Sequence, residues 1–229
     1  MDPFLAPTPF FDYDHPHVEA WIRRQLDGVG DDPVTQIQHL YLAVRDGIRY
    51  NPYVFQTNPS SFKASDALKR GESYCIPKAV LLGAAARAIG IPSRLGLADV
   101  RNHLSSPRLI EFLQSDIFRM HGYIELFIAG QRVKATPAFN AALCETMNVE
   151  PLEFDGYHDS VFQAYTASGD AHMEYVADHG VFPDVPHEFI VSGIRSAYSH
   201  LFDHEGNATG FSGSLERDIA NRRSAPQTT

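Results

Sequence analysis

Apolar positions in the first third of the chain recur at the spacing of amphipathic helices. The pattern predicts one helix over residues 14–28 and a second over residues 32–46, and each begins with a capping residue close to a proline. A shorter helix is predicted over residues 63–70, whereas residues 48–55 are β-prone but interrupted by Pro52. The apolar positions of the first two helices are Val18, Trp21, Ile22, Leu26, Ile37, Leu40, Tyr41 and Val44.

Residues 75–89 are apolar on nearly every side, which predicts a helix buried in the core. Pro77 stands near its start and Gly90 just beyond its end, as expected for helix termini. Because helices precede the strands, the expected fold class is α+β. The segments that follow are predicted as three strands, over residues 93–100, 121–128 and 132–135, and one amphipathic helix, over residues 107–118.

The last two strands are joined by Ala129-Gly130, and the length of this loop sets their register. A two-residue loop places Glu125 opposite Lys134, a favourable charge pair, and puts His121 and Thr136 on one face of the hairpin. A three-residue loop would shift the register by one and turn Thr136 away. The charge pair favours the two-residue loop, so we expect His121 and Thr136 to be diagonal neighbours.

Composition predicts a single domain over residues 1–211, followed by a polar C-terminal tail over residues 212–229. The chain has 229 residues, 44% of them hydrophobic, which allows a sizeable core. Its formal charge of -9 argues against nucleic-acid or anionic-membrane partners. No apolar stretch approaches the roughly 20 residues that span a bilayer, and the N-terminus, which begins Met1-Asp2-Pro3-Phe4, has no basic segment followed by an apolar one, so a cytoplasmic location is expected.

Cys75, one of only two cysteines, stands at the start of the predicted buried helix. The free backbone N–H groups and the positive end of the peptide dipoles at a helix N-terminus stabilise a thiolate, so the pattern predicts a lowered thiol pKa and a nucleophile. A small, buried, structural cysteine is the alternative. The second cysteine, Cys144, is expected to be a free thiol, and the cysteine count does not match a structural zinc site.

Four segments together resemble the transglutaminase-like superfamily. They are Gly71-Glu72-Ser73-Tyr74-Cys75, Gly90-Ile91-Pro92-Ser93-Arg94, His121-Gly122-Tyr123-Ile124-Glu125-Leu126 and Arg132-Val133-Lys134-Ala135-Thr136-Pro137. The resemblance covers about residues 41–140. It implies a papain-like core, in which a helical half carrying the Cys75 helix packs on an antiparallel β-sheet or half-barrel carrying His121.

The same resemblance implies that Cys75 attacks a carbonyl group and that His121 moves the proton. Where the family has an aspartate that orients the histidine, this sequence has Thr136, whose neutral hydroxyl can fix a tautomer but cannot stabilise an imidazolium as a carboxylate does. Asn140 and Asp155 are alternative orienting residues. The upstream donor to the oxyanion is Tyr50, Asn51 or Tyr53, and spacing does not choose among them.

The predicted function is cysteine-dependent acyl transfer, or hydrolysis of an amide or ester, on an acyl, amide or peptide-like substrate without a cofactor. One alternative is a catalytically silent interaction module. Another is a His-dependent metalloenzyme, although no metal ligands are assigned. Residues 99–103 are interpreted as a solvated loop, with a place on the cleft wall as the alternative. The residues that suggest a metal are His172, Glu174 and His179, and His200, Asp203 and His204.

Overall fold

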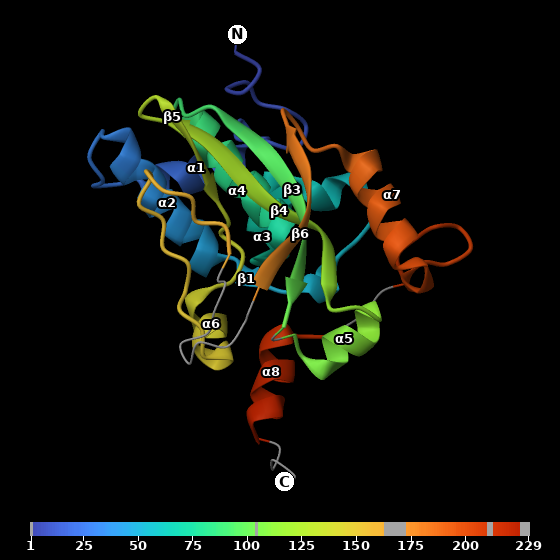
Figure 1. Ribbon diagram of the computed structural model, residues 1–229. Coiled ribbons are helices and arrows are strands. Elements are labelled where there is room, and N and C mark those ends of the chain that lie inside the picture. Colours follow the sequence, from blue (N-terminus) through green and yellow to red (C-terminus); the bar gives the residue numbers. More distant parts are fainter. Residues whose placement is uncertain (1, 104, 163–172, 210–212, 225–229) are drawn as a thin grey trace.

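A helical half and a four-stranded antiparallel sheet make up the protein (Figure 1). The computed structural model describes residues 2–103, 105–162, 173–209 and 213–224. The α+β class is confirmed. The first four helices are α1 (Pro16–Gln25), α2 (Pro33–Gly47), α3 (Ala64–Arg70) and α4 (Cys75–Ala88), and short 3-10 turns cover Pro52–Val54, Pro59–Phe62 and Ser199–Leu201.

The sheet has the strand order β5-β4-β3-β6, and all its neighbours are antiparallel. A separate parallel pair, β1 (Arg49–Tyr50) and β2 (Glu72–Ser73), leads the chain into α4. The strands of the sheet are β3 (Ser93–Asn102), β4 (Ile117–Ile128), β5 (Gln131–Ala135) and β6 (Met173–Phe182). The remaining helices are α5 (Pro107–Leu113), α6 (Ala141–Met147), α7 (His187–Ala197) and α8 (Leu215–Ser224).

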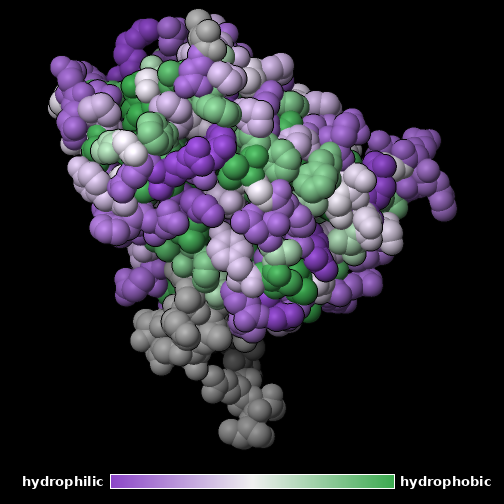
Figure 2. Space-filling model, turned by 45° about the horizontal axis from the view of Figure 1, so that its top comes forward, coloured by the Kyte–Doolittle hydropathy of each residue, from purple (hydrophilic) through white to green (hydrophobic). Residues whose placement is uncertain are grey.

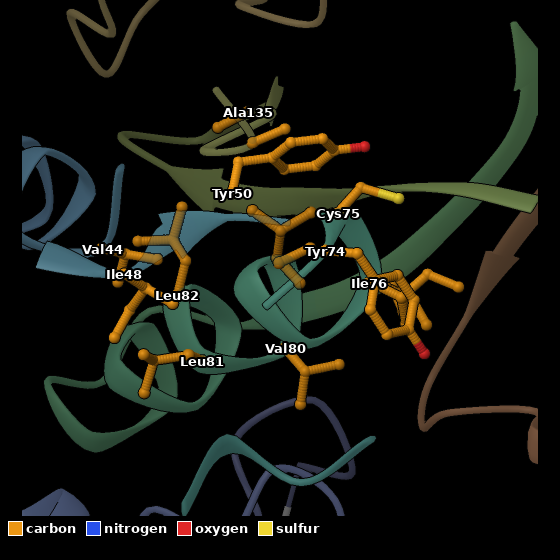
Figure 3. Packing of buried hydrophobic residues seen from close by; sticks show 14 of the residues in the cluster. Val44, Ile48, Tyr50, Tyr74, Cys75, Ile76, Val80, Leu81, Leu82 and Ala135 are labelled. Carbon is orange, nitrogen blue, oxygen red and sulfur yellow. The ribbon is translucent and has the colours of Figure 1, made fainter. Parts of the chain in front are cut away.

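Helix α4 is the centre of the core and lies behind the sheet in Figure 1. Every residue from Cys75 to Arg87 is buried, as its apolar pattern predicts. Small residues let its neighbours approach closely, since a Cβ at Gly83 would lie 2.4 Å from the ring of Phe11 and 2.6 Å from Ile124. The side chains around the start and middle of α4 are shown in Figure 3.

Two buried basic side chains of α4, those of Lys78 and Arg87, bind it to its neighbours by hydrogen bonds. The Nζ of Lys78 donates to the carbonyl oxygens of Arg45 and Ile48, where α2 ends. The guanidinium of Arg87 donates to Ser93 at the start of β3 and also to carbonyls elsewhere in the chain. Burial lowers the pKa of Lys78 to about 7. Because unpaired buried cations are costly, these bonds select one position for α4 against α2 and β3.

The hairpin of β4 and β5 has the register of the two-residue loop, with Glu125 opposite Lys134. Ala129 and Gly130 both have positive φ, 49° and 83°, which is typical of the tight turns that join twisted strands. The charge pair used to choose this register is not the one formed, because the Glu125 carboxylate accepts from the guanidinium of Arg94 on β3. The register prediction is therefore confirmed, while its electrostatic reason is wrong.

Three local predictions differ from the structure. The helix predicted over residues 107–118 ends at Leu113, because Gln114 adopts a left-handed conformation, and residues 117 and 118 already belong to β4. The β-prone stretch 48–55 contributes only the two residues of β1 before a 3-10 turn. Residues 99–102 are not a loop but the end of β3.

The segment predicted as a polar tail contains α8, which differs from that prediction. Leu215 and Ile219 of α8 are buried, and Asp218 accepts a hydrogen bond from the Tyr53 hydroxyl at 2.7 Å. Two apolar residues at helical spacing are enough to attach a helix whose other residues are mostly polar.

Polar residues cover most of the face seen in Figure 2, and apolar residues reach this surface in several separate places.

Candidate active site

Cys75 is the first residue of α4, with its side chain at the helix end that faces β4. The approach depends on Gly122, because a Cβ there would lie 2.8 Å from the Cα of Ile76 and 3.1 Å from its backbone nitrogen. Only glycine allows β4 to touch the first turn of α4 so closely. His121 precedes Gly122, so this contact brings the cysteine and the histidine to one place from distant parts of the chain.

The thiol of Cys75 is only 8% exposed, and burial raises its pKa to about 11. The backbone N–H groups of Gly122, Ile76 and Cys75 favour the thiolate, but they do not outweigh burial. The lowered pKa expected from the helix N-terminus is therefore wrong for the protein as it stands. The helix end supplies the expected N–H groups, but the loss of hydration on burial destabilises the thiolate more than these groups stabilise it.

His121 on β4 is 3% exposed, and burial lowers the pKa of its imidazole to about 4. Its Nε2 atom has no hydrogen-bond partner among the residues that the structure describes. Cys75 and His121 line the same cavity. At neutral pH the site thus contains a neutral thiol and a neutral imidazole instead of an ion pair.

Thr136 follows β5 and lies 3% exposed, with a hydroxyl oxygen that also lacks a partner within the described part of the chain. Thr136 and His121 border a second, small cavity of about 10 Å³. The backbone of Thr136 is held by its N–H, which donates to the carbonyl of Ser160 at 2.8 Å. His121 and Thr136, which each carry an unpaired polar atom, therefore border the same small space. Buried polar atoms without a hydrogen-bond partner are rare, so this pair requires an explanation.

The other two candidates for orienting His121 have different partners. The side-chain oxygen of Asn140 accepts from the backbone N–H of Tyr50 at 3.0 Å, and its nitrogen donates to Glu216 at 3.2 Å. Asp155 is exposed and accepts from the backbone N–H groups of residues 157 and 158 and from the ring of His158 at 2.6 Å. Asn140 therefore links β1 to α8, and Asp155 stabilises its own turn.

The structure distinguishes the three candidates for the oxyanion donor. Tyr50 lines the Cys75 cavity, and in Figure 3 its ring lies beside Cys75 with the hydroxyl on the same side as the sulfur. Asn51 does not line this cavity, and its amide donates to the carbonyl of Gly213 at 3.0 Å and to Glu72 at 3.2 Å. Tyr53 lines the cavity, but its hydroxyl is bonded to Asp218.

Asp99 is a site residue whose role sequence reasoning missed. It is 2% exposed and accepts from the backbone N–H of Met120 at 3.1 Å, from Nε2 of His179 at 2.9 Å and from Arg119 at 2.6 Å. Burial alone would raise the pKa of Asp99, but the hydrogen bonds from His179 and Arg119 hold it below its ordinary value. Its sequence signal is an acidic residue that follows the apolar run Leu95 to Ala98.

These bonds stabilise an irregularity directly before His121. The pairing of β3 with β4 shifts register between Ala98 and Val100, and Met120 has a φ of 57°. A left-handed methionine is strained and persists only where its surroundings hold it. The Asp99 carboxylate supplies that support, so it helps to set the direction in which the His121 side chain leaves the strand.

Histidines that suggested a metal have other roles where they can be described. His179 bonds to Asp99, Nε2 of His200 bonds to the carbonyl of Phe112 at 2.8 Å, and the Asp203 carboxylate accepts from backbone groups of its own turn. His172 lies outside the described residues. Within the described ranges, no group of three or more His, Cys, Asp or Glu side chains is arranged to hold a metal.

Comparison with known proteins agrees with this geometry. The sequence pattern of the transglutaminase-like superfamily matches residues 20–136, slightly more than half of the chain, and the match includes Cys75, His121 and Thr136. The chain belongs to this superfamily, a family of proteins with the general fold of cysteine enzymes.

The solved structures that are similar include that of a candidate cysteine protease from Cytophaga hutchinsonii. The TM-score is 0.44 with 17% sequence identity, and the match covers 59% of this chain and 40% of that one. The match therefore extends over less than half of the bacterial protein. No curated protein is similar enough to count as a match. Among the described residues, no helix has the length and apolar character needed to cross a membrane.

Proposed function

We propose that the protein catalyses cysteine-dependent acyl transfer, or hydrolysis of an amide or ester, with Cys75 as the nucleophile and His121 as the base. The observation that carries this proposal is the shared cavity of Cys75 and His121, to which the tight contact at Gly122 brings both residues. A nucleophile and a base that border the same cavity are the minimum that covalent acyl chemistry requires.

The reaction begins when His121 takes the proton of the Cys75 thiol as the sulfur attacks the substrate carbonyl. The oxygen of the tetrahedral intermediate then accepts hydrogen bonds from the backbone N–H of Cys75 and from the Tyr50 hydroxyl. The imidazolium of His121 returns its proton to the leaving amine or alcohol, and the bond from carbon to the leaving group breaks. Water or a second amine attacks the acyl-enzyme, with His121 again as base, and Cys75 leaves as a thiol.

The orienting role falls to Thr136 in this proposal. Its hydroxyl accepts the hydrogen of Nε2 of His121 through one water in the small cavity that both residues border. That cavity measures about 10 Å³, close to the smallest space that holds a water molecule, roughly 10 to 15 Å³. The neutral Thr136 hydroxyl suits a site in which the Cys75 thiol and the His121 imidazole are both neutral at rest. It can fix the tautomer of a neutral imidazole, whereas an aspartate would favour the imidazolium.

Alkylation with iodoacetamide tests the nucleophile and its base. Cys144 is an internal control, since burial raises its pKa to about 11 as well, but it does not line the cavity of Cys75. We expect Cys75 to react faster than Cys144 in the folded protein, and its rate to rise between pH 7 and pH 10. His121→Gln should slow Cys75 at pH 7 and leave Cys144 unchanged. An unchanged Cys75 rate in that variant would remove His121 from the mechanism.

A catalytically silent module is the second candidate, because Thr136 replaces the family's aspartate and the Cys75 thiol has a raised pKa. Turnover separates the two. A catalyst should hydrolyse a p-nitrophenyl ester with a burst of p-nitrophenol equal to the protein concentration, and Cys75→Ser should abolish the burst. A silent module should show no burst in either protein, although both melt at the same temperature.

A further inference from the structure

The cavity beside Cys75 has walls that are almost entirely apolar. It lies where the start of α4, the 3-10 turn after β1, α5, the first part of β4 and α7 meet. Its walls include Pro52, Phe55, Phe112, Phe118, Ile194 and Leu201. An apolar wall around a nucleophile selects substrates by the group that it buries.

The cavity offers no free charge to a substrate within the described residues. Arg119 is the one lining side chain with a permanent charge, and its guanidinium donates to the buried Asp99 carboxylate at 2.6 Å. An anionic substrate group would lose its hydration there and would meet only a guanidinium that the Asp99 carboxylate already neutralises. Apart from the His121 imidazole, the polar groups near the sulfur include tyrosine hydroxyls, of which that of Tyr198 donates to the carbonyl of Ile117 and accepts from the N–H of Arg119 at 2.9 Å.

The size of the cavity limits what it holds. Its volume is about 90 Å³. An enclosed apolar cavity of about 150 Å³ holds a benzene ring, so this smaller but open space takes one ring at most. A longer group would have to extend beyond the cavity.

We propose that the group next to the reacting carbonyl of the substrate is uncharged and apolar and has the size of a phenyl ring. The inference rests on the proposed function, since it assigns the substrate class of the same site. Aromatic walls also favour a ring, because rings pack edge to face against one another. Phe112 already packs in this way on Tyr53, at a centroid distance of 5.7 Å and an angle of 75°.

A polar remainder of the substrate has a place outside the cavity. A wider groove shares Tyr53, Phe55 and Ala208 with the apolar cavity and continues along Gln56, Asn58 and Glu72. The two spaces therefore lie next to each other, the apolar one at Cys75 and the more polar one along Gln56, Asn58 and Glu72. A molecule with one ring and a hydrophilic chain would place the ring in the apolar cavity and the chain in the polar groove.

Three chloroacetamides with one reactive group test the inference on the intact protein. They are 2-chloroacetamide, N-benzyl-2-chloroacetamide and N-(carboxymethyl)-2-chloroacetamide, and in each the thiol displaces chloride. Mass spectrometry gives the rate at Cys75, which is divided by the rate with glutathione to remove intrinsic reactivity. We expect the benzyl compound to react about tenfold faster than 2-chloroacetamide or more, because burying a ring stabilises the complex. The carboxymethyl compound should react no faster than 2-chloroacetamide.

A matched pair of variants locates the effect. Leu113→Asp puts a carboxylate on the cavity wall and should reduce the benzyl preference, whereas Leu42→Asp, at an exposed leucine of α2, should keep it. Equal rates for all three compounds, or a preference for the carboxylate, would overturn the substrate class and leave the nucleophile intact. No labelling of Cys75 by any compound would overturn the proposed function itself. If Leu113→Asp does not fold, the rate ratios of the unaltered protein decide alone.

Discussion

Replacing His121 tests the neutral resting state of the site through the stability of the protein. Burial lowers the pKa of this imidazole from its ordinary 6.5 to about 4. Between these two values the unfolded chain binds a proton that the folded chain does not. The free energy of unfolding must therefore fall as the pH is lowered from about 7 towards 4, and His121→Gln removes this contribution.

The size of the effect follows from the two pKa values. At pH 5 the unfolded imidazole is almost fully protonated and the folded one is almost neutral, which costs the wild type about 2 kcal/mol relative to pH 7. Other groups contribute to acid sensitivity, but they are the same in the variant. Between pH 7 and pH 5, the wild type should lose about 2 kcal/mol more than His121→Gln.

Urea denaturation at the two pH values measures this difference, followed by circular dichroism or tryptophan fluorescence. His17→Gln, which removes an exposed imidazole, is the matched control. An equal loss of unfolding free energy between pH 7 and pH 5 in the wild type and in His121→Gln would show that the imidazole is not desolvated. A smaller loss in the wild type than in His121→Gln would indicate an imidazolium held by a Cys75 thiolate, and it would refute the neutral pair.

Three further substitutions test the contacts around the site. Gly122→Ala should cost about 1 to 3 kcal/mol of stability and slow Cys75 alkylation, because its Cβ would meet Ile76; Gly30→Ala, with open space around it, is the control for urea melts and alkylation rates. Asp99→Asn should lose about 1.5 to 3 kcal/mol and slow ester turnover, and normal turnover in a folded variant would show that His121 needs no such support. Leu215→Ala should cost about 2 kcal/mol or more if α8 is docked, whereas a frayed tail predicts less than about 0.5 kcal/mol in the same melts.

Local sequence patterns predicted most of the elements. Helices α1 and α2 have their own side-chain caps and periodicity, α4 is a continuous apolar stretch, and Ala129-Gly130 forms the tight turn that its composition predicts. The family motifs placed Cys75 at a helix start and His121 on a strand, and both placements are confirmed. These features depend on neighbours within a few residues, so a sequence can specify them directly.

The protonation state of the site was decided by tertiary structure alone. A helix N-terminus favours a thiolate, but how much water the surrounding chain removes depends on every element that packs on Cys75. The same holds for Asp99, whose three partners come from β4 and β6 and appear in no local pattern. Helix α8 is held by two buried apolar residues and by the carboxylates of Asp218 and Glu216, whose partners Tyr53 and Asn140 are distant in the sequence.

The sequence by itself therefore determined most helices and strands up to residue 135 and which residue types could do chemistry, whereas α6, β6, α7 and α8 had no clear local pattern. Only the tertiary structure decided the charge of those residues, their partners and the shape of the space beside them. The physical reason is that burial and long-range hydrogen bonds are properties of the whole packed chain, whereas capping, periodicity and turn formation are properties of short segments.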